Sequence, residues 1–193
     1  MPPMNRHPAS DVLHDYFGFD DFRGDQRAII DHILSGGHAM VVAPTGSGKS
    51  LCYQIPALVL PAEMGDLTLV LSPLIALMKD QVDALERRGV PATFINSSLD
   101  RENRTARYEA IADGRYRLLY VTPERFRKAD FRAALGHRRV GLLAVDEAHC
   151  VSHWGHDFRQ DYRNLGQLKT ALPGVPIMAL TATADMATQQ DIQ

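Results

Sequence analysis

Short apolar runs alternate along the chain with longer stretches in which apolar residues recur every three or four positions. The runs are apolar at successive positions, which is typical of strands that are covered by helices on both faces. We predict strands at residues 40–42, 67–71, 92–95, 118–121, 142–145 and 177–180.

The segments between these runs favour helices. In residues 26–34, for example, the isoleucines and Leu34 fall on one helical face. We predict helices at residues 24–34, 48–60, 74–88, 101–112, 129–135 and 161–171. This alternation predicts an α/β fold in which a parallel sheet with right-handed crossovers is flanked by helices on both faces. Ligands of such sheets bind at the carboxyl ends of the strands.

Composition narrows the class of protein. The chain has 193 residues, 45% hydrophobic and 23% charged, which suits one globular domain or a tight pair. No stretch reaches the roughly 20 apolar residues of a membrane span, and residues 1–10 lack the apolar centre of a secretory signal. We therefore expect no membrane partner, and we expect residues 1–12 to be extended or disordered.

Charge and cysteine content add two constraints. The net charge of −2 excludes a uniformly basic surface, so any binding of nucleic acid must come from local patches. One basic cluster is either such a patch or a solvated helix face; it comprises Arg125, Arg127, Lys128, Arg132, Arg138 and Arg139. Cys52 and Cys150 form no CxxC pair, which favours a reducing, cytoplasmic setting.

A phosphate-binding loop follows the first predicted strand. Its backbone amides would surround an anion at the start of the next helix; the candidate residues are Thr45, Gly46, Ser47, Gly48, Lys49 and Ser50. Lys49 would reach the β- and γ-phosphates, and Ser50 would bind Mg²⁺. Ala43 replaces the first glycine of the general G-x-x-x-x-G-K-[ST] pattern, which argues against small-molecule kinases. The alternative is an ordinary strand–turn–helix connection.

Two adjacent carboxylates follow the strand predicted at 142–145. Burial of charges at a strand end is unfavourable unless a cation meets them. We expect Asp146 to hold Mg²⁺ together with Ser50, and Glu147 to orient and deprotonate an attacking water molecule. With Lys49, these acids are the candidate catalytic residues. Acids at a helix start can also serve only as capping groups.

Several motifs resemble those of superfamily-two helicases, and two resemble the RecQ DNA helicases in particular. Residues 146–149 read Asp-Glu-Ala-His, the DEAH form of the second helicase motif, and 181–183 read Thr-Ala-Thr, like the third. Residues 72–81 and 122–125 resemble segments that contact nucleic acid. Residues 17–26 resemble the adenine-recognition motif of RecQ, and 149–162 its aromatic-rich loop.

The resemblance assigns roles to further residues. On the nucleotide side it implies that Phe19 stacks on adenine, Arg23 supports the base and Gln26 reads its edge. Gly24 stands where the family usually has proline. The alternative for the phenylalanines of this segment is packing.

On the nucleic-acid side, the resemblance implies contacts with a single strand, made by Ser72, Lys79, Thr122, Trp154, Phe158 and Arg159. His153 replaces the usual glutamine, and Trp154 could instead anchor the core. Coupling between the two sites is implied for His149, Thr181 and Thr183.

The expected whole is a RecA-like P-loop NTPase lobe at residues 13–193, with the second lobe of the motor absent. The resemblance implies a monomeric, nucleoid-associated 3′–5′ DNA helicase of recombination and repair. It would use ATP and Mg²⁺, act on single-stranded and duplex DNA, and need a second RecA-like lobe. The alternatives are an RNA helicase or remodeller of the same superfamily and a non-catalytic docking fragment.

Overall fold

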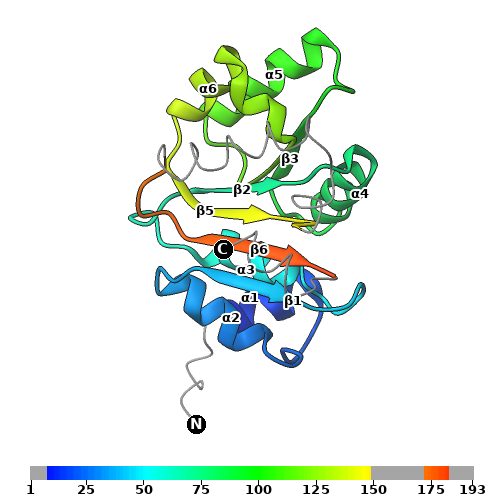
Figure 1. Ribbon diagram of the computed structural model, residues 1–193, viewed down its shortest axis with the longest axis vertical. Helices are drawn as coiled ribbons and strands as arrows, with labels where there is room; N and C mark the ends of the chain where they lie inside the picture. Colours follow the sequence, from blue (N-terminus) through cyan, green and yellow to red (C-terminus); the bar gives the residue numbers. More distant parts are fainter. Residues whose placement is uncertain (1–7, 149–171, 183–193) are drawn as a thin grey trace.

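The computed structural model describes residues 8–148 and 172–182, which form a parallel sheet with helices on both faces (Figure 1). The strands of this sheet are β1 (Ala39–Val42), β2 (Leu67–Leu71), β3 (Ala92–Ile95), β4 (Leu118–Val121), β5 (Val140–Val145) and β6 (Ile177–Thr181). Their order is β1-β6-β5-β2-β4-β3, and every pair is parallel. The predicted α/β fold is therefore confirmed. Within the described residues, no helix has the length and apolar character needed to cross a membrane.

The helices that connect these strands largely match the sequence pattern. They are α1 (Pro8–Phe17), α2 (Gln26–Leu34), α3 (Leu51–Val59), α4 (Ile75–Glu86), α5 (Arg101–Ala112) and α6 (Ala129–Gly136), with a 3₁₀ helix η1 (Pro123–Arg127). Helix α3 begins later than predicted because Gly48 has φ +82°, which is outside the helical region. The helix predicted at 161–171 lies outside the described residues.

Two apolar cores cover the opposite faces of the sheet. Successive residues of β4 alternate between them: Leu118 and Tyr120 face α1 to α4, whereas Leu119 and Val121 face α5 and α6. Every residue of β5 is buried, as expected for a central parallel strand covered on both sides. The alternation explains why the predicted strands were apolar at successive positions.

The expectation of an unstructured N-terminus through residue 12 is wrong for residues 8–12, which belong to α1. Ala9, Leu13 and Phe17 recur every four residues and are buried against the core on the α3 side. The Arg88 guanidinium also lies 5.5 Å from the centre of the Phe17 ring. Phe17 thus has a packing role, the alternative that the sequence left open for the phenylalanines of this segment.

Candidate nucleotide-binding site

The loop between β1 and α3 has the backbone conformation of a phosphate-binding turn. Gly46 and Gly48 both have positive φ, +80° and +82°, which glycine adopts without strain. The loop is tied at its start, where the amide of Ala43 donates to the Thr181 carbonyl at 3.1 Å. The ammonium of Lys49 folds back and donates to the carbonyls of Ala43 (2.6 Å) and Pro44 (3.0 Å).

The loop fits a bound phosphate. Among the described residues, the buried hydroxyl of Ser47 has no hydrogen-bond partner, so an additional acceptor would satisfy it. A Cβ placed on Gly46 would meet nothing within 4 Å, so the space over this part of the loop is open. The Lys49 ammonium carries the complementary charge. These features suit a triphosphate, with Thr45, Gly46 and Ser47 lining the turn.

The acidic pair lies at the carboxyl end of β5. Asp146 is 7% exposed, and its amide donates to the Leu71 carbonyl at 2.8 Å. One of its carboxylate oxygens accepts from the amide of Glu147 at 3.0 Å. Glu147 has φ +52°, a conformation rare outside glycine that often occurs at functional sites. The chain therefore changes direction directly after Asp146, at the end of β5.

The sheet brings the phosphate loop and the acidic pair to the same side, where the parallel strands have their carboxyl ends. Strand β6 pairs with β1 on one side and β5 on the other, and its end receives a hydrogen bond from each: Ala43 donates to Thr181, and Ala148 donates to Leu180 at 2.8 Å. Figure 1 shows the arrowheads of β1, β6 and β5 at one side of the sheet. The phosphate loop and the acidic pair therefore flank the end of β6.

A buried tyrosine lies next to the phosphate loop. Tyr53 lies one turn after Ser50 on α3 and is 0% exposed. Burial raises its pKa well above the ordinary value, and the charge of Asp146 raises it further, whereas a hydrogen bond from the side chain of Ser50 opposes the shift. The amide of Tyr53 also donates to the Ser50 carbonyl at 3.2 Å, so this residue connects the end of the phosphate loop to the core.

The predicted ligands Ser50 and Asp146 are of the type that Mg²⁺ uses. It is commonly bound by one or two carboxylates and by the phosphates of a nucleotide. Among the described residues, no group of three histidine, cysteine or acidic side chains forms a separate metal site. Burial also raises the pKa of the neighbouring Cys52 thiol to about 11, so this cysteine is a neutral core residue.

The predicted adenine-binding residues are connected to the phosphate loop. Phe19 is 40% exposed, and the Arg23 guanidinium lies 5.7 Å from its ring centre. Gln26 is buried; its Nε2 donates to the carbonyls of Ser47 (3.3 Å) and Gly48 (3.2 Å), while its Oε1 accepts from the amide of Arg23 (2.9 Å). Sequence reasoning missed this bracing of the loop by Gln26. Its reading of the adenine edge stays a prediction.

The predicted nucleic-acid contacts divide into buried and exposed residues. The side chains of Ser72 and Thr122 are buried: Ser72 Oγ accepts from the amide of Leu74 at 3.4 Å, and Thr122 donates to Glu124 at 2.5 Å. They stabilise local turns rather than face solvent. Lys79 is exposed on α4 and pairs with Asp83. Of the coupling residues, Thr181 is buried at the end of β6. His149, Trp154, Phe158, Arg159 and Thr183 lie outside the described residues.

The basic cluster does not act as one surface. The side chain of Arg138 is 2% exposed; it pairs with Asp66 at 2.9 Å and donates to the carbonyls of Ile111 and Tyr116. Arg138 is therefore a structural residue, and it is not part of a DNA-facing patch. Arg127 and Arg139 are exposed.

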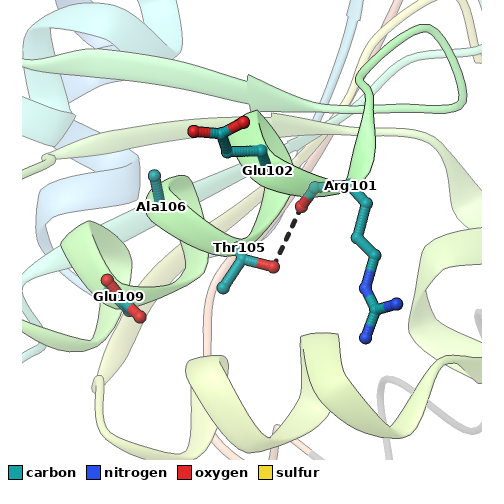
Figure 2. A pocket seen from close by; sticks show the side chains of 5 residues that line it. All are labelled: Arg101, Glu102, Thr105, Ala106 and Glu109. Atoms are coloured by element: carbon teal, nitrogen blue, oxygen red, sulfur yellow. Dashed lines mark hydrogen bonds between the residues drawn. The ribbon is translucent and has the colours of Figure 1, made fainter.

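A separate pocket lies along α5, the helix that follows β3 at the opposite edge of the sheet from the phosphate loop. Its volume is about 570 Å³, and it is lined by Arg101, Glu102, Thr105, Ala106 and Glu109. The Thr105 hydroxyl donates to the backbone carbonyl of Arg101 at 2.9 Å, while the side chains of Arg101 and Glu102 point in opposite directions (Figure 2). Its lining carries mixed charge and does not suggest a particular ligand.

Comparisons with known proteins define the class first. The chain belongs to the DEAD/DEAH box helicase family, whose model matches residues 23–192. Solved helicases share the fold. The DUF1998 helicase MrfA bound to DNA has a TM-score of 0.72 at 18% identity, covering 99% of this chain and 28% of that one. A hypothetical ATP-dependent RNA helicase from Sulfolobus tokodaii has a TM-score of 0.69 at 21% identity, covering 98% and 54%. The RecA-like fold is thereby confirmed.

The closer kinship is with RecQ, which confirms the resemblance drawn from the motifs. The chain is 51% identical over 189 residues to the ATP-dependent DNA helicase RecQ of Haemophilus influenzae, covering 98% of this chain and 30% of that protein. It is 46% identical over 188 residues to RecQ of Bacillus subtilis, covering 96% and 31%. The chain thus spans about 30% of the length of these relatives.

Proposed function

We propose that this chain is the ATP-binding motor lobe of a RecQ-like helicase that moves 3′ to 5′ along single-stranded DNA and unwinds duplex DNA in recombination and repair. The observation that carries the proposal is the meeting of the phosphate loop and the acidic pair on the two sides of the end of β6. Identities of 46–51% to RecQ helicases favour DNA over RNA as the partner.

In this mechanism, each group of the site has one task. The loop amides bind the triphosphate, and Lys49 exchanges its carbonyl acceptors for phosphate oxygens. Ser50 and Asp146 would hold Mg²⁺, which would neutralise charge on the transferring phosphoryl group. Glu147 orients the attacking water and accepts its proton. Phe19 stacks on the adenine, while Arg23 and Gln26 support the base.

The proposed motor needs further elements besides the nucleotide site. A second RecA-like lobe would supply an arginine to the phosphoryl group and the other half of the DNA track. Trp154, Phe158 and Arg159 would hold the single strand, together with the segments of Ser72, Lys79 and Thr122. His149, Thr181 and Thr183 would couple strand binding to hydrolysis. Such a motor would act as a monomer on DNA in the cytoplasm.

Nucleotide binding by the chain tests the proposal directly. We expect Lys49→Ala to lower the affinity for a fluorescent ATP analogue in the presence of Mg²⁺ by about tenfold or more, because a hydrogen bond to a charged group contributes about 1.5–3 kcal/mol. Lys79→Ala is the matched control, since this lysine pairs with Asp83 on the surface of α4. Equal affinities for the three proteins would contradict the assignment of the loop.

Binding of nucleic acid by the same chain distinguishes a DNA helicase from an RNA helicase and from a docking fragment. We expect single-stranded DNA to bind more tightly than RNA of the same sequence and length when measured by fluorescence anisotropy with the nucleotide present. A preference for RNA would favour an RNA helicase or remodeller. Binding of nucleic acid without any binding of nucleotide would favour a docking fragment.

A further inference from the structure

A series of buried hydrogen bonds runs between α3 and the sheet. The hydroxyls of Tyr53 and Tyr120 lie 3.3 Å apart. Gln54 Nε2 donates to the Tyr120 hydroxyl at 3.2 Å and to Gln81 Oε1 at 3.1 Å. These side chains come from α3, β4 and α4. The series, which we call the tyrosine–glutamine link, thus connects three elements that meet only in the tertiary structure.

Packing alone does not require this link. Tyr53 is 0% exposed and Tyr120 is 1% exposed, and their rings meet edge to face with centres 6.3 Å apart. Phenylalanine would fill the same space without burying a hydroxyl, and burial of an unpaired polar group is unfavourable. The buried hydroxyl and amide groups of the link therefore indicate a role beyond filling the core.

One end of the link lies at the nucleotide site. Tyr53 follows Ser50 by one turn at the start of α3, and the amides of both Tyr53 and Gln54 donate to the Ser50 carbonyl. The carboxylate of Asp146 lies near enough to influence both Tyr53 and Tyr120. A shift of the Ser50 backbone would therefore move Tyr53 and Gln54 together, because their amides lie 3.2 and 3.0 Å from its carbonyl oxygen.

The other end lies on α4. Gln81 belongs to this helix, which begins after the carboxyl end of β2 and carries Lys79. Leu74 and Ile75 at its start are 40% and 36% exposed. In the proposed motor, this segment faces the nucleic acid. The link thus runs from the residues proposed to hold Mg²⁺ to a helix proposed to contact the strand.

The hydrogen bond between the two phenols allows two arrangements of the link. Each phenol has one proton, so the Tyr53–Tyr120 hydrogen bond can run in either direction with little movement of heavier atoms. A cation held by Ser50 would move the Ser50 backbone and shift Tyr53 and Gln54 against Tyr120 and Gln81, while the Tyr120 oxygen accepts from Gln54 in either arrangement. Two such states are what coupling between distant sites requires.

We propose that Tyr53, Gln54, Tyr120 and Gln81 are positioning residues that transmit nucleotide binding at the phosphate loop to helix α4. The inference rests on the proposed function, because it requires the loop to bind nucleotide. It adds a route from the nucleotide to the strand-contacting helix that runs through the core.

Hydrogen exchange on the whole chain, with and without Mg-ATP, measures both ends of this route at once. In the native protein we expect nucleotide to slow exchange in residues 46–52 and, by about threefold or more, in residues 78–84 of α4. In Tyr120→Phe and in Gln81→Met, we expect protection of residues 46–52 to remain and the nucleotide-dependent protection of α4 to disappear. Gln81 is half-buried, so its variant tests the link even if a core variant fails to fold.

Tyr108→Phe is the matched control. Tyr108 is also buried, but it packs against Phe131 in the core on the opposite face of the sheet. We expect this variant to respond to nucleotide as the native protein does. Protection of α4 that persists in Tyr120→Phe and Gln81→Met, or is absent from the native protein while residues 46–52 are protected, would overturn the link alone. No protection of residues 46–52 would overturn the proposed function as well.

Discussion

Gly46 and Gly48 of the phosphate loop have almost the same φ but different surroundings. Both have positive φ. A Cβ on Gly46 would meet nothing within 4 Å, whereas a Cβ on Gly48 would lie 2.5 Å from Gln26 Nε2. Gly48 is therefore favoured for its conformation, and a side chain there would also displace the Gln26 amide. Through this contact the base-binding segment and the phosphate loop form one unit.

A comparison of Gly48→Ala with Gly46→Ala tests whether Gln26 stabilises the phosphate loop. Each substitution forces a left-handed alanine at a cost of about 1–2 kcal/mol. Gly48→Ala must also displace Gln26 and its hydrogen bonds to Ser47 and Gly48, so we expect it to lower the free energy of unfolding by about a further 1–2 kcal/mol. Urea unfolding without nucleotide measures the difference. Equal destabilisation of the two variants would show that Gln26 does not brace the loop.

At the scale of elements, the buried side chain of Arg138 connects helices on one face of the sheet to the strands. Arg138 lies between α6 and β5, pairs with Asp66 just before β2, and donates to the Ile111 carbonyl in α5. It also donates to the carbonyls of Asp66 and Tyr116. This set of bonds joins carbonyls near the ends of several elements through one buried guanidinium.

Arg138→Met should therefore destabilise the fold. We expect a loss of about 3 kcal/mol in the free energy of unfolding, because the substitution removes the ion pair with the partly exposed Asp66 and the charged hydrogen bonds to the carbonyls of Asp66 and Tyr116. Arg139→Met is the control, since Arg139 is exposed, and we expect a change within about 0.5 kcal/mol. A similar loss in both variants, measured by urea unfolding, would contradict the structural role of Arg138.

At the scale of the whole molecule, the candidate site is open on one side. Thr45 and Gly46 of the loop are exposed, and Phe19 is 40% exposed. The chain also spans about 30% of the length of its RecQ relatives. In the proposed motor, a second lobe would close over this open side of the site.

We therefore expect the isolated chain to bind Mg-ATP weakly, to hydrolyse it slowly and to unwind no duplex. An arginine supplied by another lobe increases turnover by about 10³–10⁵ in related phosphoryl-transfer enzymes, and this chain would lack that contribution. Phosphate release and a fluorescence assay of strand separation provide the measurements. Robust unwinding by the chain alone would contradict the single-lobe mechanism.

Much of the fold could be predicted because its elements are encoded locally. Strands β2, β3 and β4 and helix α5 have the bounds that the apolar pattern indicated. Helix α1 was missed although its buried residues recur every four positions, because early prolines and polar residues surround them. The buried positions of Ser72 and Thr122 could not be predicted either, because burial depends on which segments cover them.

The sequence by itself determined the phosphate loop, the acidic pair and the kinship with RecQ, since these depend on residue types at short, regular spacings. Only the tertiary structure decided that β6 lies between β1 and β5, that Gln26 supports the loop, and that Tyr53 reaches Tyr120. Strand order and core contacts join segments far apart in the chain. They are set by the fit of whole surfaces, which no local pattern contains.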